Sequence, residues 1–454
     1  MIPERLQWLW ADGSPTRALS ELFTEAGREL YLVGGSLRDA LLDVAHDDLD
    51  FATDARPDEI KQLVRPVAEA VYTLGELFGT IGVRIGDHVY EITTFRDEIY
   101  HEESRKPDVT FSDSIETDLS RRDFTINSMA LRLPDAEIVD PFGGLADLAR
   151  RELRTPLGPE VSFGDDPLRM LRLFRFASTT GFEINATTEA AVVDMADRLE
   201  IVSSERIRDE LSKLLVSSRP ATGLRGIVRT GLAEHFLPEL VELQQQRDPL
   251  HRHKDVWEHT LAVVEKTDPT LRIRLAALLH DIGKPATREF GPNGVTFHHH
   301  EVVGARMARQ RLKALRYSRE LVEEVGQLVF LHLRPHTFKM GWTDSAVRRY
   351  VRDAGPLLGD LNQLVRCDVT TGNKKRADAI QRRIDELEER IEVLSAQEEL
   401  ASLRPPIDGN DVMAYLGIEP GPEVGRIMKL LMEHRIDHGP FTPEEAYALV
   451  RDWT

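Results

Sequence analysis

The chain has 454 residues, and its 58 Lys and Arg against 77 Asp and Glu give a net charge of −19 with neutral histidines. That balance argues against a surface coated in positive charge for non-specific nucleic-acid binding. The net charge is a sum over the whole molecule, however, and does not exclude a local basic groove. An apolar fraction of 41% excludes a disordered chain, and the single cysteine, Cys367, excludes an internal disulfide and a zinc site of the cysteine type.

Targeting and membrane signals are absent from the sequence. The N-terminus has no basic region followed by an uninterrupted apolar run, and no segment approaches the roughly 20 apolar residues that span a bilayer. We therefore expect a cytoplasmic protein without membrane contact. At this length the chain is expected to form about two to four domains.

Strand signals are concentrated between residues 30 and 150. Residues 30–33 form a short apolar run that stops at two glycines, and residues 80–85 and 89–94 are rich in β-branched residues on either side of Gly86-Asp87, which predicts a hairpin. Pro57 is typical of the first turn of a helix. These signals predict a module that mixes strands and helices.

From about residue 151 the apolar residues recur at spacings of three and four, as at Leu168, Leu171 and Phe174. This periodicity predicts that the rest of the chain is almost entirely helical. Residues 374–394 are dense in alternating charges but carry one apolar seam, which is typical of an exposed helix packed on one face. A partner-binding helix is the alternative interpretation of that seam.

The first cluster of functional residues follows the first strand. Gly34-Gly35 leads into a helix, where the backbone N–H groups of the first turn and the helix dipole favour a phosphate, and Arg38 would add further donors. Asp48 and Asp50 lie two residues apart, so on an extended strand their carboxylates point the same way and repel each other unless a divalent cation bridges them. The pattern therefore predicts magnesium held against a triphosphate, although each half alone also occurs in ordinary turns and loops.

The combination of these motifs resembles the polymerase-β-like nucleotidyltransferases, and within them the class II tRNA CCA-adding enzymes and bacterial poly(A) polymerases. The resemblance continues in order along the chain through residues 78–80, 91–96, 118–130 and 140–144. It implies that Asp48 and Asp50 are the catalytic magnesium ligands, that Gly35, Arg38 and Arg122 contact the nucleotide, and that Glu91 is a candidate third carboxylate.

A second cluster places Asp166, Arg169, Arg172 and Arg175 at a strict period of three, so that on a helix they form one slowly turning stripe. A solvated helix face would give the same pattern. Arginine, however, suits bidentate contacts with phosphates and base edges, and an acid beside it adds acceptors. In the resembled family, the residues corresponding to Asp166 and Arg169 read the base of CTP or ATP, and Arg172 and Arg175 would fix the nucleotide or its phosphates.

A third cluster contains His280-Asp281 at the end of an apolar helix, where both side chains would be costly to bury without a metal or charged partner. Together with other histidines and an aspartate spaced along the chain before and after it, this pair resembles the HD superfamily of metal-dependent phosphohydrolases. That resemblance implies four core ligands for a divalent transition metal, and two histidines that match second-metal or phosphate positions. The core ligands are His259, His280, Asp281 and Asp368, and the two further histidines are His300 and His332.

The resemblance implies an α+β protein: a small mixed-sheet nucleotidyltransferase head, an all-α neck, an HD-type helical domain and a helical tail. The expected boundaries are 1–152 for the catalytic head, 153–245 for the nucleotide-templating and RNA-binding neck, 246–372 for the HD domain and 373–454 for a tRNA-binding tail. Residues 96–113 resemble the family's mobile charged loop, which favours an enzyme that adds both C and A.

The implied activity is magnesium-dependent addition of C, C and A to the 3′ end of tRNA from CTP and ATP, with release of pyrophosphate. A phosphohydrolase activity of the HD domain would accompany it. Two alternatives stay open: a bacterial poly(A) polymerase of the same class, and an HD phosphohydrolase whose head only binds nucleotide. Oligomeric state is not predicted.

Overall fold

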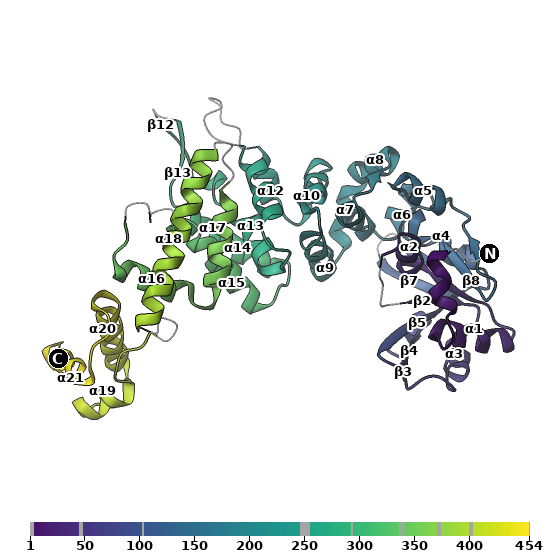
Figure 1. Cartoon of the computed structure of the whole chain (residues 1–454). Helices are drawn as coiled ribbons and strands as arrows, with labels where there is room; N and C mark the ends of the chain where they lie inside the picture. The colour runs from purple at the N-terminus through teal and green to yellow at the C-terminus, as the bar shows by residue number, and fades with distance from the viewer. Residues whose placement is uncertain are drawn as a thin grey trace. The chain divides into compact units, whose positions relative to one another are not determined.

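The computed structural model describes residues 4–44, 49–101, 104–245, 255–291, 294–335, 338, 341–369, 374–398 and 403–453. The chain divides into two compact units, Met1–Pro238 and Glu239–Thr454. The first unit combines a sheet with helices and the second is dominated by helices (Figure 1). The predicted α+β class, a mixed-sheet head followed by helical domains, is therefore confirmed.

Among the described residues, the sheet of the first unit has seven strands in the order β3-β4-β5-β2-β1-β8-β9. Strands β2 and β5 are parallel and every other neighbouring pair is antiparallel. The predicted run and the predicted hairpin are confirmed as β1 and as β4 with β5. The bounds are β1 Leu30–Val33, β2 Asp50–Thr53, β3 Ala70–Tyr72, β4 Thr80–Ile85, β5 His88–Thr94, β8 Ala130–Leu133 and β9 Glu137–Val139.

Strand β1 is central in this sheet and all four of its residues are buried, which explains why it reads as an unbroken apolar run. Helix α4 (Ile115–Ser120) covers the sheet beside β1, with Ile115 and Leu119 packed against Tyr31, Ala52 and Phe95. The remaining helices of this region are α1 Pro15–Glu25, α2 Gly34–Leu41, α3 Pro57–Leu63 and α5 Gly144–Arg150.

Residues 96–113, the segment that resembles the family's mobile charged loop, contain two strands in their described part. Strands β6 (Arg96–His101) and β7 (Ser104–Phe111) pair antiparallel in a separate ribbon. Neither strand has a continuous apolar run or a regular alternation of apolar and polar residues, so the sequence carries no local strand signal here.

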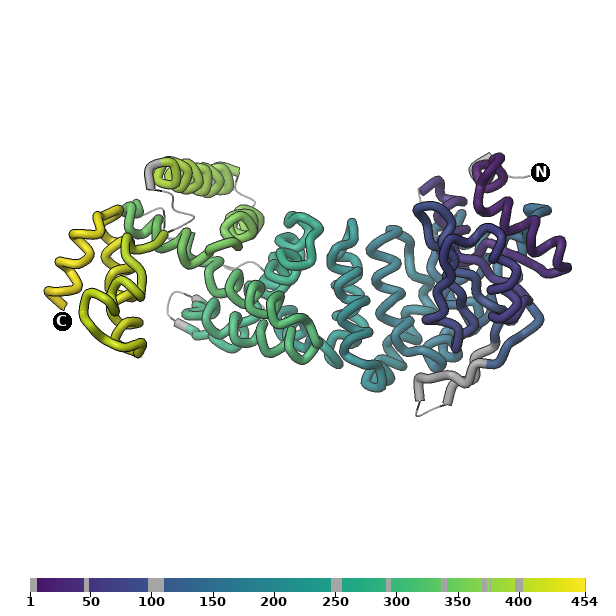
Figure 2. The backbone as a smooth tube through the Cα atoms, turned by 90° about the horizontal axis from the view of Figure 1, so that it is seen from below, coloured from purple at the N-terminus to yellow at the C-terminus, as the bar shows by residue number. Residues whose placement is uncertain are grey.

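Five helices complete the first unit, with α7 packed against both α9 and α10. In Figure 2 these helices run side by side as teal tubes. Two glycines of α10 permit the contact, because a Cβ at Gly226 would lie 2.2 Å from the Phe174 ring and one at Gly223 would lie 2.3 Å from Ser178 Oγ. The bounds are α6 Pro159–Asp165, α7 Leu168–Thr180, α8 Ala186–Met195, α9 Ser204–Leu215 and α10 Pro220–Arg229.

In its described residues, the second unit has helices and one short hairpin of β12 (Arg288–Gly291) and β13 (Gly294–Phe297). With the two-residue strands β10 (Glu152–Leu153) and β11 (Glu183–Ile184), this hairpin is an exception to the predicted helical remainder. The helices are α11 Glu239–Gln244, α12 Val256–Lys266, α13 Leu271–Leu279, α14 His300–Ala314, α15 Arg319–Leu331, α16 Asp344–Ala354, α17 Leu358–Asp368, α18 Lys374–Glu398, α19 Gly409–Leu416, α20 Pro422–His438 and α21 Pro443–Trp453.

The charged helix α18 buries its apolar seam within the second unit. Ile384, Leu387, Ile391 and Leu394 are buried, and the helix packs against α16 and α17. The interpretation as an exposed helix packed on one face is thus confirmed. None of the helices in the described ranges is both long and apolar enough to cross a bilayer.

Candidate active site and metal centre

The turn from β1 into α2 requires glycine. Gly34 has a φ of +68°, and a Cβ at this position would lie 2.9 Å from Nη1 of Arg122. Gly34 and Gly35 open α2 without a side-chain cap, so the N–H groups of the first turn have no competing side-chain acceptor at the cap. The structure thus brings Arg122 to the same turn as Gly35, as predicted for a nucleotide-binding pair.

Asp50 begins β2, and its backbone N–H donates to Ser36 Oγ at 2.9 Å. In the parallel ladder its register partner on β5 is Glu91, the predicted third carboxylate. Paired positions of neighbouring strands direct their side chains to the same face of the sheet. The register therefore suits a pair of metal ligands. Asp48, the other predicted carboxylate, lies outside the described residues.

Arg38 is fixed by two partners. Its Nε and Nη2 donate to the two carboxylate oxygens of Asp39 at 2.8 and 2.9 Å, and its Nη1 donates to Asn127 Oδ1 at 2.6 Å. The guanidinium lies 5.3 Å from the ring centroid of Phe176 on α7. Arg38 therefore lies between the turn at the start of α2 and the helix that carries the arginine stripe.

Arg122 and its neighbour Arg121 share one buried acid, Asp118, through contacts of 3.0 and 2.5 Å. Burial by itself would raise the pKa of Asp118, but the charges of Arg122 and Arg121 outweigh it and hold the pKa below its usual value. The carboxylate therefore stays ionised and orients Arg122 toward the Gly34 turn.

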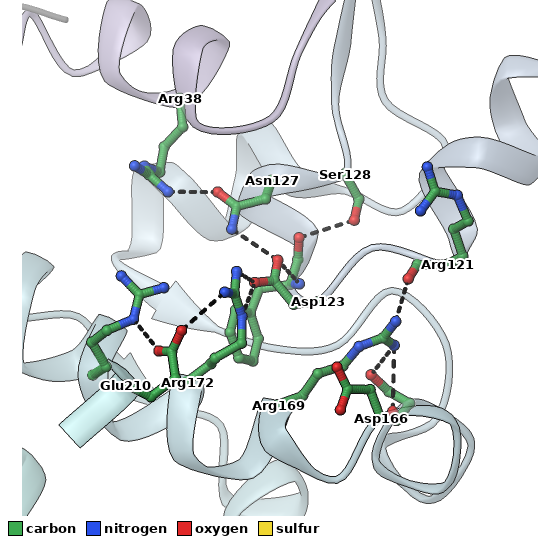
Figure 3. Close-up of polar contacts among 12 residues, drawn as sticks. Arg38, Arg121, Asp123, Asn127, Ser128, Asp166, Arg169, Arg172 and Glu210 are labelled. Carbon is green, nitrogen blue, oxygen red and sulfur yellow. Dashed lines mark hydrogen bonds and ion pairs between the residues drawn. The ribbon is translucent and has the colours of Figure 1, made fainter. Parts of the chain in front are cut away.

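Asp123 connects the head to the arginine stripe (Figure 3). Its Oδ1 accepts from Asn127 Nδ2 at 2.9 Å, and its Oδ2 accepts from Nε and Nη2 of Arg172 at 3.0 and 2.5 Å. Burial opposes ionisation of Asp123, but the Arg172 charge and these hydrogen bonds keep its pKa well below the ordinary range. A continuous polar chain therefore runs from Arg38 through Asn127 and Asp123 to Arg172.

The stripe of α7 has a second buried partner in Glu210 of α9. Arg172 Nη1 donates to Glu210 Oε1 at 3.3 Å, and Arg175 Nε donates to its Oε2 at 2.5 Å. Arg175 also stacks over Phe176 at 4.2 Å from the ring centroid. These pairs show that Arg172 and Arg175 are not simply a solvated face, because each is held against a buried carboxylate.

Asp166 and Arg169 lie at the junction of α6 and α7. The Asp166 carboxylate is held by Arg206 of α9, whose Nη2 and Nη1 donate to its two oxygens at 2.6 and 3.2 Å. Arg169 is buried and donates to Ser162 Oγ at 2.9 Å and to the Arg121 carbonyl at 2.5 Å (Figure 3). The predicted base-reading pair is thus fixed in place by neighbouring groups.

Sequence reasoning assigned no role to three residues that hold this network together: Asp123, Arg206 and Glu210. Asp123 lies inside residues 118–130, a block that carries the family resemblance, and Arg206 and Glu210 lie on α9. Arg206 and Glu210 are four positions apart, so they share one face of α9. That spacing was the available signal that α9 faces the stripe.

The candidate metal centre of the second unit draws its side chains from three helices, α12, α14 and α17, and from the C-terminal ends of two more, α13 and α15. Among the described residues, the groups that offer ligand atoms within 4.8 Å of one another are His259, His280 and Asp368, and Asp281, His300 and His332. All four predicted core ligands and both additional histidines are therefore brought together. Of the shortest separations, His259 Nε2 lies 2.9 Å from Asp368 Oδ1 and 3.2 Å from His280 Nε2.

Three of these histidines are held in the same tautomer. The Nδ1 atoms of His280, His300 and His332 lie 2.8, 2.8 and 2.6 Å from the carbonyl oxygens of Ala277, Phe297 and Val329. A carbonyl only accepts, so each Nδ1 carries a proton, and Nε2 is the ring atom that each histidine can offer to a metal at the centre. A hydrogen bond of this kind is what orients histidine ligands in metal sites.

His332 fits a metal ligand in its protonation as well. Burial and the neighbouring His280 lower the pKa of His332 to about 3, so the ring is neutral. Its Nε2 is buried and, within the described part of the chain, has no hydrogen-bond partner. A buried lone pair without a donor is costly unless a cation accepts it. Together with the carboxylates, the donor set therefore fits one or two divalent ions.

Two further groups shape the metal centre. Lys284 Nζ lies 2.5 Å from Asp281 Oδ2. Gly283 lets the start of α14 approach, because a Cβ there would lie 2.3 Å from the His300 carbonyl oxygen and 2.7 Å from the Gly304 nitrogen. This close backbone contact brings His300 to Asp281. Asp281 Oδ1 lies 3.4 Å from His300 Nε2.

Three family models match the chain in sequence order. A poly(A) polymerase head domain matches residues 30–154, a probable RNA and SrmB-binding site of polymerase A matches residues 181–243, and an HD domain matches residues 256–369. The first covers the sheet and the Asp118–Asp123 network, and the third covers every residue of the metal centre.

Curated relatives match the chain over most of its length. An A-adding tRNA nucleotidyltransferase of Deinococcus radiodurans is 35% identical and covers 93% of this chain and 95% of the relative. A CC-adding tRNA nucleotidyltransferase of Thermus thermophilus is 32% identical, with 94% of both chains covered. A CCA-adding enzyme of Latilactobacillus sakei is 41% identical over 52% of this chain and 60% of the relative.

Solved structures share the fold along the whole chain. The Bacillus stearothermophilus CCA-adding enzyme in complex with CTP has a TM-score of 0.67 at 24% identity, covering 100% of this chain and 98% of that one. The Thermotoga maritima CCA-adding enzyme complexed with tRNA has a TM-score of 0.61 at 19% identity, covering 99% and 98%. At these identities the likeness concerns the fold.

Proposed function

The chain belongs to the tRNA nucleotidyltransferase family, and from that premise we propose that it adds C, C and A to the 3′ end of tRNA from CTP and ATP. The observation that carries the proposal is the polar chain from Arg38 through Asp123 to Arg172, which joins the turn suited to a triphosphate to the stripe suited to a base.

In this proposal the tRNA 3′-hydroxyl attacks the α-phosphate of the bound nucleotide and pyrophosphate leaves. Asp48 and Asp50 would hold magnesium, with Glu91 adjacent to Asp50 in the sheet. Magnesium in such a site lowers the barrier by activating the hydroxyl and stabilising charge on the leaving group.

The chain's own residues position the nucleotide. The N–H groups at Gly35, with Arg38 and Arg122, would bind the triphosphate, and Asp166 with Arg169 would present acceptors and donors to the base edge. Arg172 and Arg175, fixed by buried carboxylates, would complete the wall against the ribose or phosphates. Because these groups are held before the nucleotide arrives, little ordering remains to be done during binding.

A narrower activity is the second candidate, because the relatives that span nearly the whole chain are named as an A-adding and a CC-adding enzyme. Three RNA substrates decide between the candidates: a tRNA ending before CCA, one ending in C and one ending in CC. With CTP and ATP, the full enzyme extends all three to CCA. An A-adding enzyme extends only the last, and a CC-adding enzyme stops after the second C. A long A tail would contradict all three and support a poly(A) polymerase.

For the second unit we propose a phosphohydrolase that uses a divalent transition metal. The convergence of His259, His280, Asp281 and Asp368, with the lone pair of His332 unpartnered, supports a metal centre and hence hydrolysis of a phosphoester. The test measures hydrolysis of a 2′,3′-cyclic phosphate with added metals. A His280→Ala variant that hydrolyses as fast as the parent would refute this role. Both activities are proposed for the cytoplasm, where tRNA and nucleoside triphosphates are available.

A further inference from the structure

A groove between α14 and α15 in the second unit is not used by either reaction. It encloses about 550 Å³, with Val302, Ala305 and Phe330 among its apolar residues and Arg306, Arg309 and Lys313 among its polar ones. On a helix, residues two positions apart point about 200° away from each other. Val302 and Phe330 each lie two positions from a metal-centre histidine, so the groove and the metal centre lie on different faces of these helices.

Ion pairs separate the basic residues of this segment into two sets. Arg311 points to the other side of α14, where it pairs with Glu239 at 2.9 Å. Arg309 is held in the groove wall by Glu323 at 2.7 Å, and Lys313 reaches the same acid only at 3.7 Å. The Arg306 side chain is exposed and forms no ion pair with the described residues. The three cationic side chains of the groove thus have a single acid, Glu323, as their ion-pair partner among the described residues.

The spacing of these cations suits a polyanion. Arg306, Arg309 and Lys313 are three and four positions apart, so they follow one face of α14 at about 5.4 Å per turn. Repeating charges of this kind match the repeating phosphates of a nucleic-acid strand. The apolar residues beneath them, including Val302 at 48% exposure, can contact the faces of riboses or bases.

We propose that this groove binds the phosphate backbone of an RNA strand. Resting on the proposed function, the strand is part of the tRNA whose 3′ end the first unit extends. A chain with a net charge of −19 repels RNA on average, so affinity for RNA must come from local surfaces of opposite sign. The groove is such a surface, and it gives the second unit a part in holding the tRNA independent of its metal.

The test compares two double variants of the full chain that remove equal charge. Arg306→Gln with Lys313→Gln changes the groove. Arg382→Gln with Arg383→Gln changes two exposed arginines of α18 that form no ion pair with described residues. Binding of tRNA is measured from about 50 to 200 mM salt, the range over which phosphate contacts dominate affinity.

The groove variant is expected to bind tRNA about 10-fold more weakly at low salt and to lower the salt slope by about 1.5, since each lost phosphate contact removes about 0.7 to 0.9. The α18 variant should match the parent. The proposal is overturned if the two variants bind tRNA equally well. It is also overturned if the groove variant loses affinity for an acidic polypeptide while it binds tRNA as the parent does.

Two measurements keep the outcomes distinct. Thermal unfolding checks that the variants fold, and if the double variant is unstable, Arg306→Gln alone carries the same comparison with about half the effect. Nucleotide addition to a short RNA primer tests the first unit separately. If the parent protein adds no nucleotide, the proposed function is wrong. If the parent adds nucleotides but its groove variant binds tRNA as the parent does, only the proposal about the groove is wrong.

Discussion

The two units hold their clustered ionisable side chains in different ways. In the first unit, Arg172 and Arg175 are neutralised by the chain's own acids, Asp123 and Glu210. In the metal centre, histidines fixed by backbone carbonyls direct their lone pairs inward, and that of His332 has no described partner. The first site is therefore organised before any ligand binds, whereas the second offers inward-facing ligand atoms whose chemistry suits a cation. Variants that remove an acid of the first unit or a candidate metal ligand of the second unit test this difference.

The largest effect is expected from the metal ligands of the head. Replacing Asp48 and Asp50 together by Asn should lower nucleotide incorporation by about 1000-fold or more, because several kcal/mol of charge stabilisation are lost. Single-turnover addition of CMP to a tRNA ending before CCA measures it. Because the head network needs no metal, the melting temperature should barely change. Persistent incorporation would show that the head is not catalytic.

The next effect is expected in the second unit. A His280→Ala variant should lose at least about 100-fold in affinity for divalent metal, since a direct ligand contributes more than its supporting hydrogen bonds. The metal content of the purified protein, measured by elemental analysis, follows this loss. Nucleotide addition by the same sample is the control and should equal that of the parent. A simultaneous loss of both activities would contradict the independence of the two sites.

A smaller effect is expected when the organised network of the first unit loses one acid. Glu210→Gln leaves Arg172 and Arg175 partly buried without their shared charge partner, which should lower the free energy of unfolding by about 2 to 3 kcal/mol. Denaturant unfolding of the first unit measures this change. Glu234→Gln, at an exposed position of a short 3-10 helix in the same unit, is a matched control that should stay within about 0.5 kcal/mol of the parent.

The smallest effect concerns the fidelity of base selection. Arg206 holds both oxygens of Asp166, so Arg206→Gln should let that carboxylate turn and reduce the preference for CTP and ATP over UTP and GTP by about 10-fold. The ratios of kcat/KM measure it. Arg206→Lys, which keeps one charged donor, should recover part of the preference. A uniform loss of rate with all four nucleotides would instead indicate general disorder of the site.

The sequence was informative where one segment determines its own structure. Leu30–Val33 and Thr80–Ile85 are strands as predicted, because the signals that predicted them, an apolar run and a group of β-branched residues, lie within each segment. Strands β10 and β11 are two residues long and exist only through each other, so no local pattern indicated them. Likewise, the ribbon at residues 96–111 is defined by cross-strand pairing.

The same distinction applies to the sites. The resemblance to the HD superfamily indicated all six residues that the structure brings together as possible metal ligands, because the same histidines and aspartates recur in the same order along the chain. For the arginine stripe, the period of three gave the residues but not their partners. Asp123 and Glu210 reach the stripe through the packing of separate elements, and a periodicity within α7 contains no information about them.

Gly283 illustrates how a residue with no functional group can set a chemical distance. The missing side chain allows the backbone of α14 to lie against the segment that carries Asp281, which makes the spacing between the two ligand groups a property of the main chain. An alanine here would act as a wedge between the start of α14 and the segment that carries Asp281, and would separate His300 from Asp281 with every candidate ligand still present. A homologue can therefore retain a complete set of histidines and aspartates and yet be inactive, and the residue at this position is the one to inspect first.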